Sequence, residues 1–163
     1  MKLLIFLHGT VIMHKNAKYN SRKERVKQSV NEDPSVLDYE NYIPVENSVK
    51  KLKTWERQGT KIIYLSSHEN LKDVKKDKDV LKKYGFPSGK IVFRKKGEQY
   101  KDIAEKIMPD ILIEDDCESI GGKKEMAITN VRPSNKKNIK SIVVREFSGI
   151  DKLPDKVEKL FLI

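Results

Sequence analysis

The sequence predicts an α/β fold in which one parallel sheet lies between two layers of helices. Short apolar runs rich in Ile, Leu and Val alternate with longer segments in which apolar residues recur every three or four positions. This alternation is typical of βαβ units, which build parallel sheets covered by helices. The chain has 163 residues, and we expect one domain that spans residues 1–163.

Five segments are predicted to form the strands of this sheet. They are Lys2–Leu7, Lys61–Ser66, Lys90–Arg94, Ile111–Glu114 and Ser141–Arg145. The fourth is apolar at successive positions, as in strands buried on both faces, and it ends in Glu114, Asp115 and Asp116. Ligands of α/β proteins bind where parallel strands end. These acids therefore indicate a candidate site at the carboxyl edge of the sheet.

The segments between the strands carry helical patterns with recognisable ends. One helix is predicted from about Val45 to Gln58 and is closed by a glycine. A second begins after Asn70 and stops before the Gly85–Pro87 segment, and a third runs from about Glu98 to Met108. Each connects two successive strands.

Two segments do not fit the simple alternation. Residues 9–42 are too long for a plain connection, so we expect a small lid that contains a basic helix at Ser21–Val30. An insertion at this point follows the first strand and hangs over its carboxyl end. Residues Cys117–Lys140 contain Gly121, Gly122 and Pro133, and we predict that they form mainly a surface loop.

The chain is basic, with 34 Lys and Arg residues against 24 Asp and Glu residues and a net charge of +10. Such a charge attracts phosphate-bearing partners. The basic residues are nevertheless spread along the whole chain, mixed with acids and free of interleaved aromatic residues. We interpret them mainly as ordinary surface charge and rank a nucleic-acid-binding protein, with Lys15–Lys27 as its contact surface, as the lowest alternative.

A single cysteine, Cys117, excludes an internal disulfide and a multi-cysteine zinc site. No segment approaches the ~18 apolar residues of a membrane span, and the opening apolar run is too short and too quickly polar for a signal peptide. We therefore expect a cytoplasmic protein without a membrane partner.

Residues whose side chains can take part in catalysis or binding follow three of the predicted strands. They are His8, Gly9, Thr10 and, further on, His14 after the first strand, Ser66, Ser67 and His68 after the second, and Asp115 and Asp116 after the fourth. Parallel strands share one carboxyl edge, so we expect these side chains to meet. All three histidines of the chain fall in this set.

The order of these elements and motifs resembles the haloacid dehalogenase superfamily of phosphatases and phosphotransferases. In that family the first strand ends Asp-x-Asp-Gly-Thr, the second ends in Ser or Thr, a Lys precedes the fourth strand, and the fourth ends in paired acids. The matching segments are Phe6–Thr10, Ile62–Ser66, the Lys95, Lys96 or Lys101 region, and Ile111–Asp116. The resemblance covers nearly the whole chain and implies a three-layer sandwich with a small lid after the first strand.

The resemblance also implies roles for these residues in phosphoryl transfer. It implies a divalent metal held by Asp115 and Asp116, and from the residues themselves we expect His8, joined by His68 or His14, as further ligands. Mg²⁺ is the ion that the family implies, whereas imidazole ligands would shift the preference toward Mn²⁺ or Zn²⁺. The catalytic residues would be His8, Ser66 and Lys95, and the phosphate would be held by Gly9, Thr10, Ser66, Ser67, Lys96 and Lys101.

The chain departs from the family pattern in its first motif, because Phe6 and His8 occupy the positions of the two aspartates. Phe6 can neither attack phosphorus nor bind a metal, whereas His8 can act as a base or accept a phosphoryl group. Our first hypothesis is a metal-dependent phosphohydrolase or phosphotransferase with an altered nucleophile motif that acts on a small phosphorylated molecule. The alternative is an inactive fold without a cofactor that binds a phosphate-bearing ligand or a protein partner.

Overall fold

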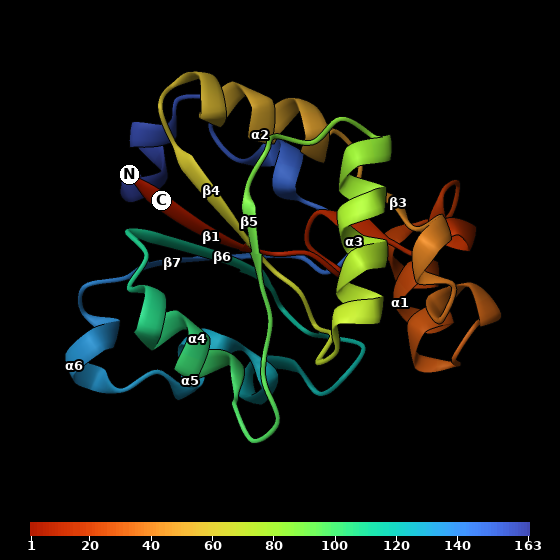
Figure 1. Cartoon of the computed structure of the whole chain (residues 1–163). Coiled ribbons are helices and arrows are strands. Elements are labelled where there is room, and N and C mark those ends of the chain that lie inside the picture. Colours follow the sequence, from red (N-terminus) through yellow and green to blue (C-terminus); the bar gives the residue numbers. More distant parts are fainter.

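A computed structural model describes residues 1–163 and has the predicted architecture, a five-stranded parallel sheet between two helical layers (Figure 1). The strands are β1 (Lys2–Phe6), β4 (Lys61–Leu65), β5 (Lys90–Val92), β6 (Ile111–Asp115) and β7 (Lys140–Val144). Their order in the sheet is β5-β4-β1-β6-β7. The five predicted strands are therefore confirmed, with small differences at their ends.

β1 lies at the centre of the sheet and aligns the ends of its neighbours. Phe6 at the end of β1 is paired with Leu65 at the end of β4, and Ile5 is paired with Ile113 of β6. Because all pairs are parallel, the residues that follow these strands emerge at one edge. Both termini of the chain lie at the opposite end of the strands (Figure 1).

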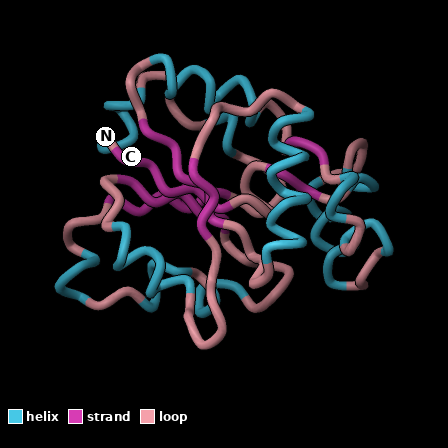
Figure 2. Tube along the Cα trace, in the orientation of Figure 1, coloured by secondary structure: helices cyan, strands magenta, loops and turns pink.

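Helices cover both faces of the sheet (Figure 2). The two helices on one face are α2 (Ser48–Arg57) and α3 (Leu71–Lys83), and the three on the other are α4 (Tyr100–Ile107), α5 (Ala127–Asn130) and α6 (Pro133–Lys136). The three predicted interstrand helices are thus confirmed as α2, α3 and α4. Trp55 of α2 is fully buried, and its indole N–H donates to the carbonyl of Pro154 at 3.0 Å.

Alternate residues of β1 fill two separate apolar cores. Leu3 and Ile5 pack with α2, α3 and the C-terminal segment, whereas Leu4 packs with α4 and α5. This division follows from the two-residue period of a strand, which points successive side chains to opposite faces. A strand apolar on both faces belongs in the centre of the sheet.

The prediction that residues 117–140 form mainly a surface loop is wrong for much of that segment. It contains a 3₁₀ turn at Gly122–Glu125 followed by α5 and α6, and it buries Met126, Ala127 and Ile128 against the sheet. The backbone N–H groups of Ala127 and Ile128 donate to the Glu114 carboxylate at 2.7 and 3.0 Å. Helices of four residues are too short to show a hydrophobic period in the sequence.

Residues 9–42 form a small flap beside the carboxyl edge, at the right of Figure 1. The flap contains the predicted basic helix as α1 (Arg22–Val30), which begins at a capping box formed by Ser21 and Glu24. Its short strand β2 (Ile12–Met13) pairs antiparallel with β3 (Ile43–Pro44). The flap therefore leaves the sheet after β1 and returns to it before α2.

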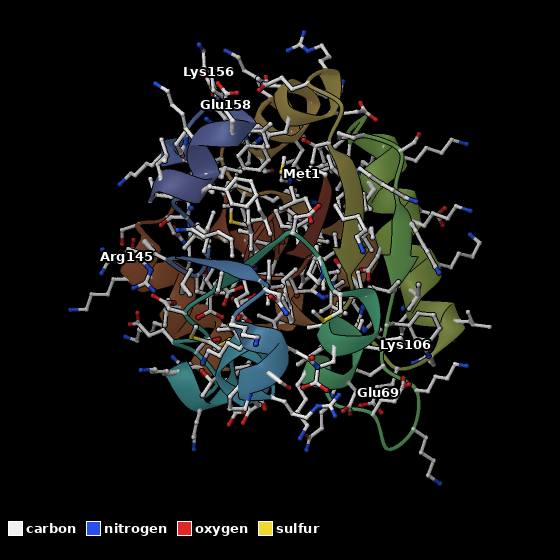
Figure 3. All side chains as sticks on the ribbon, turned by 90° about the vertical axis from the view of Figure 1, so that its left-hand side faces the viewer. Met1, Glu69, Lys106, Arg145, Lys156 and Glu158 are labelled. Carbon is white, nitrogen blue, oxygen red and sulfur yellow. The ribbon has the colours of Figure 1, made fainter.

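None of the helices is both long and apolar enough to cross a membrane. Charged side chains instead project outward around the molecule, as Lys106, Arg145 and Lys156 do in the view from the side of Met1 (Figure 3).

Gly9, at the carboxyl edge, has a backbone conformation and a close neighbour that disfavour any other residue. Its φ is +83°, and a Cβ at this position would lie 2.8 Å from Asp115 Oδ2. Gly97 has a similar φ of +87° but nothing within 4 Å. We predict that Gly97→Ala costs about 1 kcal/mol in free energy of unfolding from backbone strain alone, whereas Gly9→Ala costs roughly 3 kcal/mol because a steric clash is added. Urea unfolding of both variants measures the difference, and equal losses would contradict it.

Candidate functional site at the carboxyl edge of the sheet

The carboxyl edge carries two separate groups of polar side chains. The histidine cluster consists of His8, Ser66, Ser67, His68 and Asp77. The acidic cluster consists of Asp115, Asp116 and Glu146. The residues predicted from the sequence are divided between the two clusters.

The expected metal set of Asp115, Asp116, His8 and His68 is therefore not one group. His8 and His68 lie within ligand distance of Asp77, whereas the two aspartates lie within ligand distance of Glu146. The strand order explains the division, because β4 and β6 flank β1 on opposite sides. Strands lie about 4.8 Å apart, so residues that follow β4 and β6 start roughly 10 Å from each other.

Asp77 is the centre of the histidine cluster, and the sequence reasoning missed it. It lies on the buried face of α3, three residues after Val74 and four before Leu81, and its side chain is 1% exposed. One carboxylate oxygen, Oδ1, lies 2.9 Å from His8 Nε2. The other, Oδ2, accepts a hydrogen bond from Ser66 Oγ at 2.5 Å. An acid at a position of helical apolar spacing was the signal that could have found it.

The Asp77 carboxylate is held in its ionised form. Burial alone would raise its pKa, but the charge of His8 and the hydrogen bonds from His8 and Ser66 outweigh burial and lower the pKa well below its usual range. The cluster therefore contains a buried negative charge that its histidines and serine stabilise.

The two histidines differ in how their ring nitrogens are satisfied. His8 has a partner at each nitrogen, because Ser67 Oγ lies 2.5 Å from Nδ1 and Asp77 lies at Nε2. His68 is 8% exposed, and its Nε2 lies 3.6 Å from Asp77 Oδ1. That distance is too long for a hydrogen bond, so this buried nitrogen has no partner.

Two tyrosines of the flap cover the histidine cluster. The ring of Tyr39 lies 4.3 Å from the ring of His68, and the ring of Tyr42 lies 5.4 Å from the ring of His8, between centroids. The Tyr42 hydroxyl is fixed by donating to the carbonyl of Val36 at 2.7 Å. The flap therefore forms one wall of the cluster.

In the acidic cluster, Thr10 binds Asp115, the last residue of β6, and Arg22 binds Asp116, the residue after it. Thr10 Oγ1 donates to Asp115 Oδ2 at 2.7 Å, and the Cys117 N–H donates to Oδ1 at 2.9 Å. Arg22 Nη2 of the flap lies 3.2 Å from both oxygens of Asp116. Thr10, expected to hold phosphate, thus uses its hydroxyl within the protein.

Glu146 completes the acidic cluster and gave no signal in the sequence. Ser119 donates to both of its oxygens, from Oγ at 2.6 Å and from the backbone N–H at 2.7 Å. Burial raises the pKa of Glu146 to about 7 and also raises the pKa of Asp115.

The Mg²⁺ site implied by the family resemblance does not fit these residues. Phe6, in place of the first acid, packs edge-on against Tyr100 with centroids 5.0 Å apart. Each carboxylate oxygen of Asp115, Asp116 and Glu146 already accepts a hydrogen bond from the protein. The guanidinium of Arg22 supplies the positive charge that Mg²⁺ would supply, so we derive no chemistry through Mg²⁺ there.

The remaining predicted residues lie outside both clusters. The Lys95 and Lys96 side chains are exposed in the loop after β5, and Lys101 lines a cavity of about 300 Å³ with Arg94 and other residues. No hydrogen bond or ion pair joins these three lysines to either cluster. His14 lies in the flap, where its Nε2 is 3.1 Å from Gln28 Oε1.

The sequence matches no protein-family model and no curated protein. Among solved structures, a chain of the Pnkp1/Rnl/Hen1 RNA repair complex is similar in fold, with a TM-score of 0.53 and 16% sequence identity. The match covers 88% of this chain and 43% of that chain, so this chain spans less than half the length of its neighbour. At this identity the likeness concerns the fold alone.

Protonation of Glu114 makes the free energy of unfolding of the protein depend on pH. Its carboxylate is 1% exposed, and burial raises its pKa to about 7 from an ordinary value of 4.5. Between these two pH values the folded state therefore holds a proton that the unfolded state releases. The contribution of this proton to the free energy of unfolding is complete below pH 4.5 and is lost as pH rises to 7. We predict a loss of roughly 3 kcal/mol in free energy of unfolding over this range.

Urea unfolding at several pH values measures this slope, and Glu114→Gln should reduce it. Glu158→Gln, at an exposed position, is the matched control and should leave the slope unchanged. An equal slope in the Glu114 variant and the natural protein would contradict the prediction.

Proposed function

We propose that the protein is a divergent haloacid dehalogenase-like hydrolase of phosphate esters whose reaction takes place in the histidine cluster. One observation carries this proposal. His8, at the position of the family's acid/base aspartate, is fixed between the ionised Asp77 and the hydroxyl of Ser67. A buried carboxylate that orients an imidazole beside a hydroxyl is an arrangement typical of acid/base sites.

The covalent route of the family has no nucleophile in this chain, because Phe6 presents a ring in place of a carboxylate. Water is therefore the proposed nucleophile. The histidine cluster activates the water, its oxygen bonds to phosphorus as the ester P–O bond breaks, and a proton passes to the leaving alcohol. No aspartyl-phosphate intermediate is formed.

The proposed substrate is a small phosphorylated molecule. The net charge of +10 favours an anionic substrate. Arg94, Lys101 and Lys124 line the 300 Å³ cavity and give it positive charge. The Arg94 guanidinium stacks 4.1 Å from the ring of Tyr100, against which Phe6 packs. The structural neighbour belongs to an RNA repair complex, which makes RNA with a terminal phosphate a second candidate substrate.

The test measures release of inorganic phosphate from a panel of phosphate esters and phosphorylated RNA oligonucleotides, with Mg²⁺, Mn²⁺ or Zn²⁺ present. We expect turnover by the natural protein and a loss of at least about 100-fold in Asp77→Asn. Asp79→Asn is the matched control, because Asp79 is exposed on the same helix, and its activity should be unchanged.

Absence of turnover with every ester and ion would contradict this proposal, as would full activity in Asp77→Asn. Turnover that appears only after Phe6→Asp together with His8→Asp would favour the alternative of a non-catalytic fold that binds a phosphate-bearing ligand.

A further inference from the structure

We infer that His8, His68 and Asp77 form a binding site for a transition-metal ion of the zinc class. The site is distinct from the acidic cluster, where the family resemblance implies Mg²⁺. The inference rests on the proposed function only for the role of the ion, because binding follows from the geometry of these three side chains.

The three ligand atoms converge as a metal site requires. His8 Nε2 and His68 Nε2 lie 2.9 and 3.6 Å from the same oxygen, Asp77 Oδ1, and the three side chains offer ligand atoms within 4.8 Å of one another. A tetrahedral ion with bonds of about 2.0–2.1 Å separates its ligands by about 3.3 Å. The two distances lie on either side of this value, so small side-chain shifts would admit an ion.

His68 provides independent evidence for a ligand. Its Nε2 atom is buried, faces the Asp77 carboxylate and has no hydrogen-bond partner. An unsatisfied buried polar atom costs about 1–3 kcal/mol, so native proteins rarely leave one. Coordination of an ion by this nitrogen removes the cost.

The hydrogen bonds behind the ligands match those of known metal sites. Metal-bound histidines commonly donate their second N–H to an acceptor, and metal-bound carboxylates accept a hydrogen bond at the free oxygen. Here Ser67 Oγ lies at His8 Nδ1, and Ser66 Oγ donates to Asp77 Oδ2, each at 2.5 Å. The two serines thus leave Nε2 and Oδ1 directed toward the ion.

The surroundings leave one side open. Tyr39 and Tyr42 pack on the two imidazole rings, and Asp77 is 1% exposed. The His8 side chain, in contrast, is 14% exposed. We expect water to reach the fourth position from the His8 side, as in catalytic zinc sites that have three protein ligands. A water bound there would lose a proton near neutral pH and become the nucleophile of the proposed reaction.

Two nitrogen ligands and one oxygen ligand favour zinc, cobalt or manganese over magnesium. We expect the chelator-treated protein to bind one equivalent of Zn²⁺ in a calorimetric titration. Co²⁺ should give the intense visible absorption of a tetrahedral site. His68→Gln and Asp77→Asn should each weaken binding at least about 100-fold.

The matched controls are His14→Gln, at the histidine outside the cluster, and Asp79→Asn, and both should bind Zn²⁺ like the natural protein. Near-ultraviolet circular dichroism confirms that each variant is folded, and the two independent ligand variants prevent one misfolded protein from deciding the result. Absence of stoichiometric binding, or unchanged affinity in His68→Gln, would overturn the inference.

The outcomes also separate this inference from the proposed function. Zinc binding without turnover of any phosphate ester contradicts the proposed function and leaves the metal site in place. Turnover that survives complete removal of metal by a chelator contradicts the role of the ion in the reaction and leaves the proposed function in place, whereas absence of stoichiometric Zn²⁺ binding contradicts the metal site itself.

Discussion

The carboxyl edge depends on one buried negative charge, the carboxylate of Asp77. A carboxylate at 1% exposure is stable only if its oxygens are paired. The partners are His8, which follows β1, and Ser66, which follows β4. His68 lies near the same carboxylate at a longer distance. Asp77 thereby fixes the position of α3 relative to two strands and the direction of the imidazoles. Loss of this carboxylate would leave His8 Nε2 and the Ser66 hydroxyl without their common acceptor.

The two clusters at this edge are neutralised in different ways. The acidic cluster is paired with a guanidinium, because Arg22 of the flap binds Asp116 and also donates to the carbonyl of Glu146 at 3.1 Å. The histidine cluster contains no Lys or Arg, and the flap contributes aromatic rings to it instead. The same flap therefore closes one cluster with charge and the other with apolar surface. Of the two clusters, the histidine cluster alone keeps a buried side-chain polar atom without a partner.

The sheet and its candidate edge could be predicted from the sequence, because buried strands are apolar runs and their order along the chain places polar residues after them. The partners within the edge could not. His8 and Asp115 both follow strands at this edge, but strand order sends Ser66 and His68 to one side of β1 and Asp115 to the other. Asp77 is contributed by a helix, and Glu146 follows β7. Which acid meets which histidine depends on packing that no local pattern records.

The most direct measurement is anomalous diffraction at the zinc edge from crystals of the full chain grown with Zn²⁺. We expect one strong peak between His8 Nε2, His68 Nε2 and Asp77 Oδ1, with Ser66 and Ser67 in their present hydrogen bonds. A peak among Asp115, Asp116 and Glu146 with Arg22 displaced, or no peak at the histidine cluster, would contradict it.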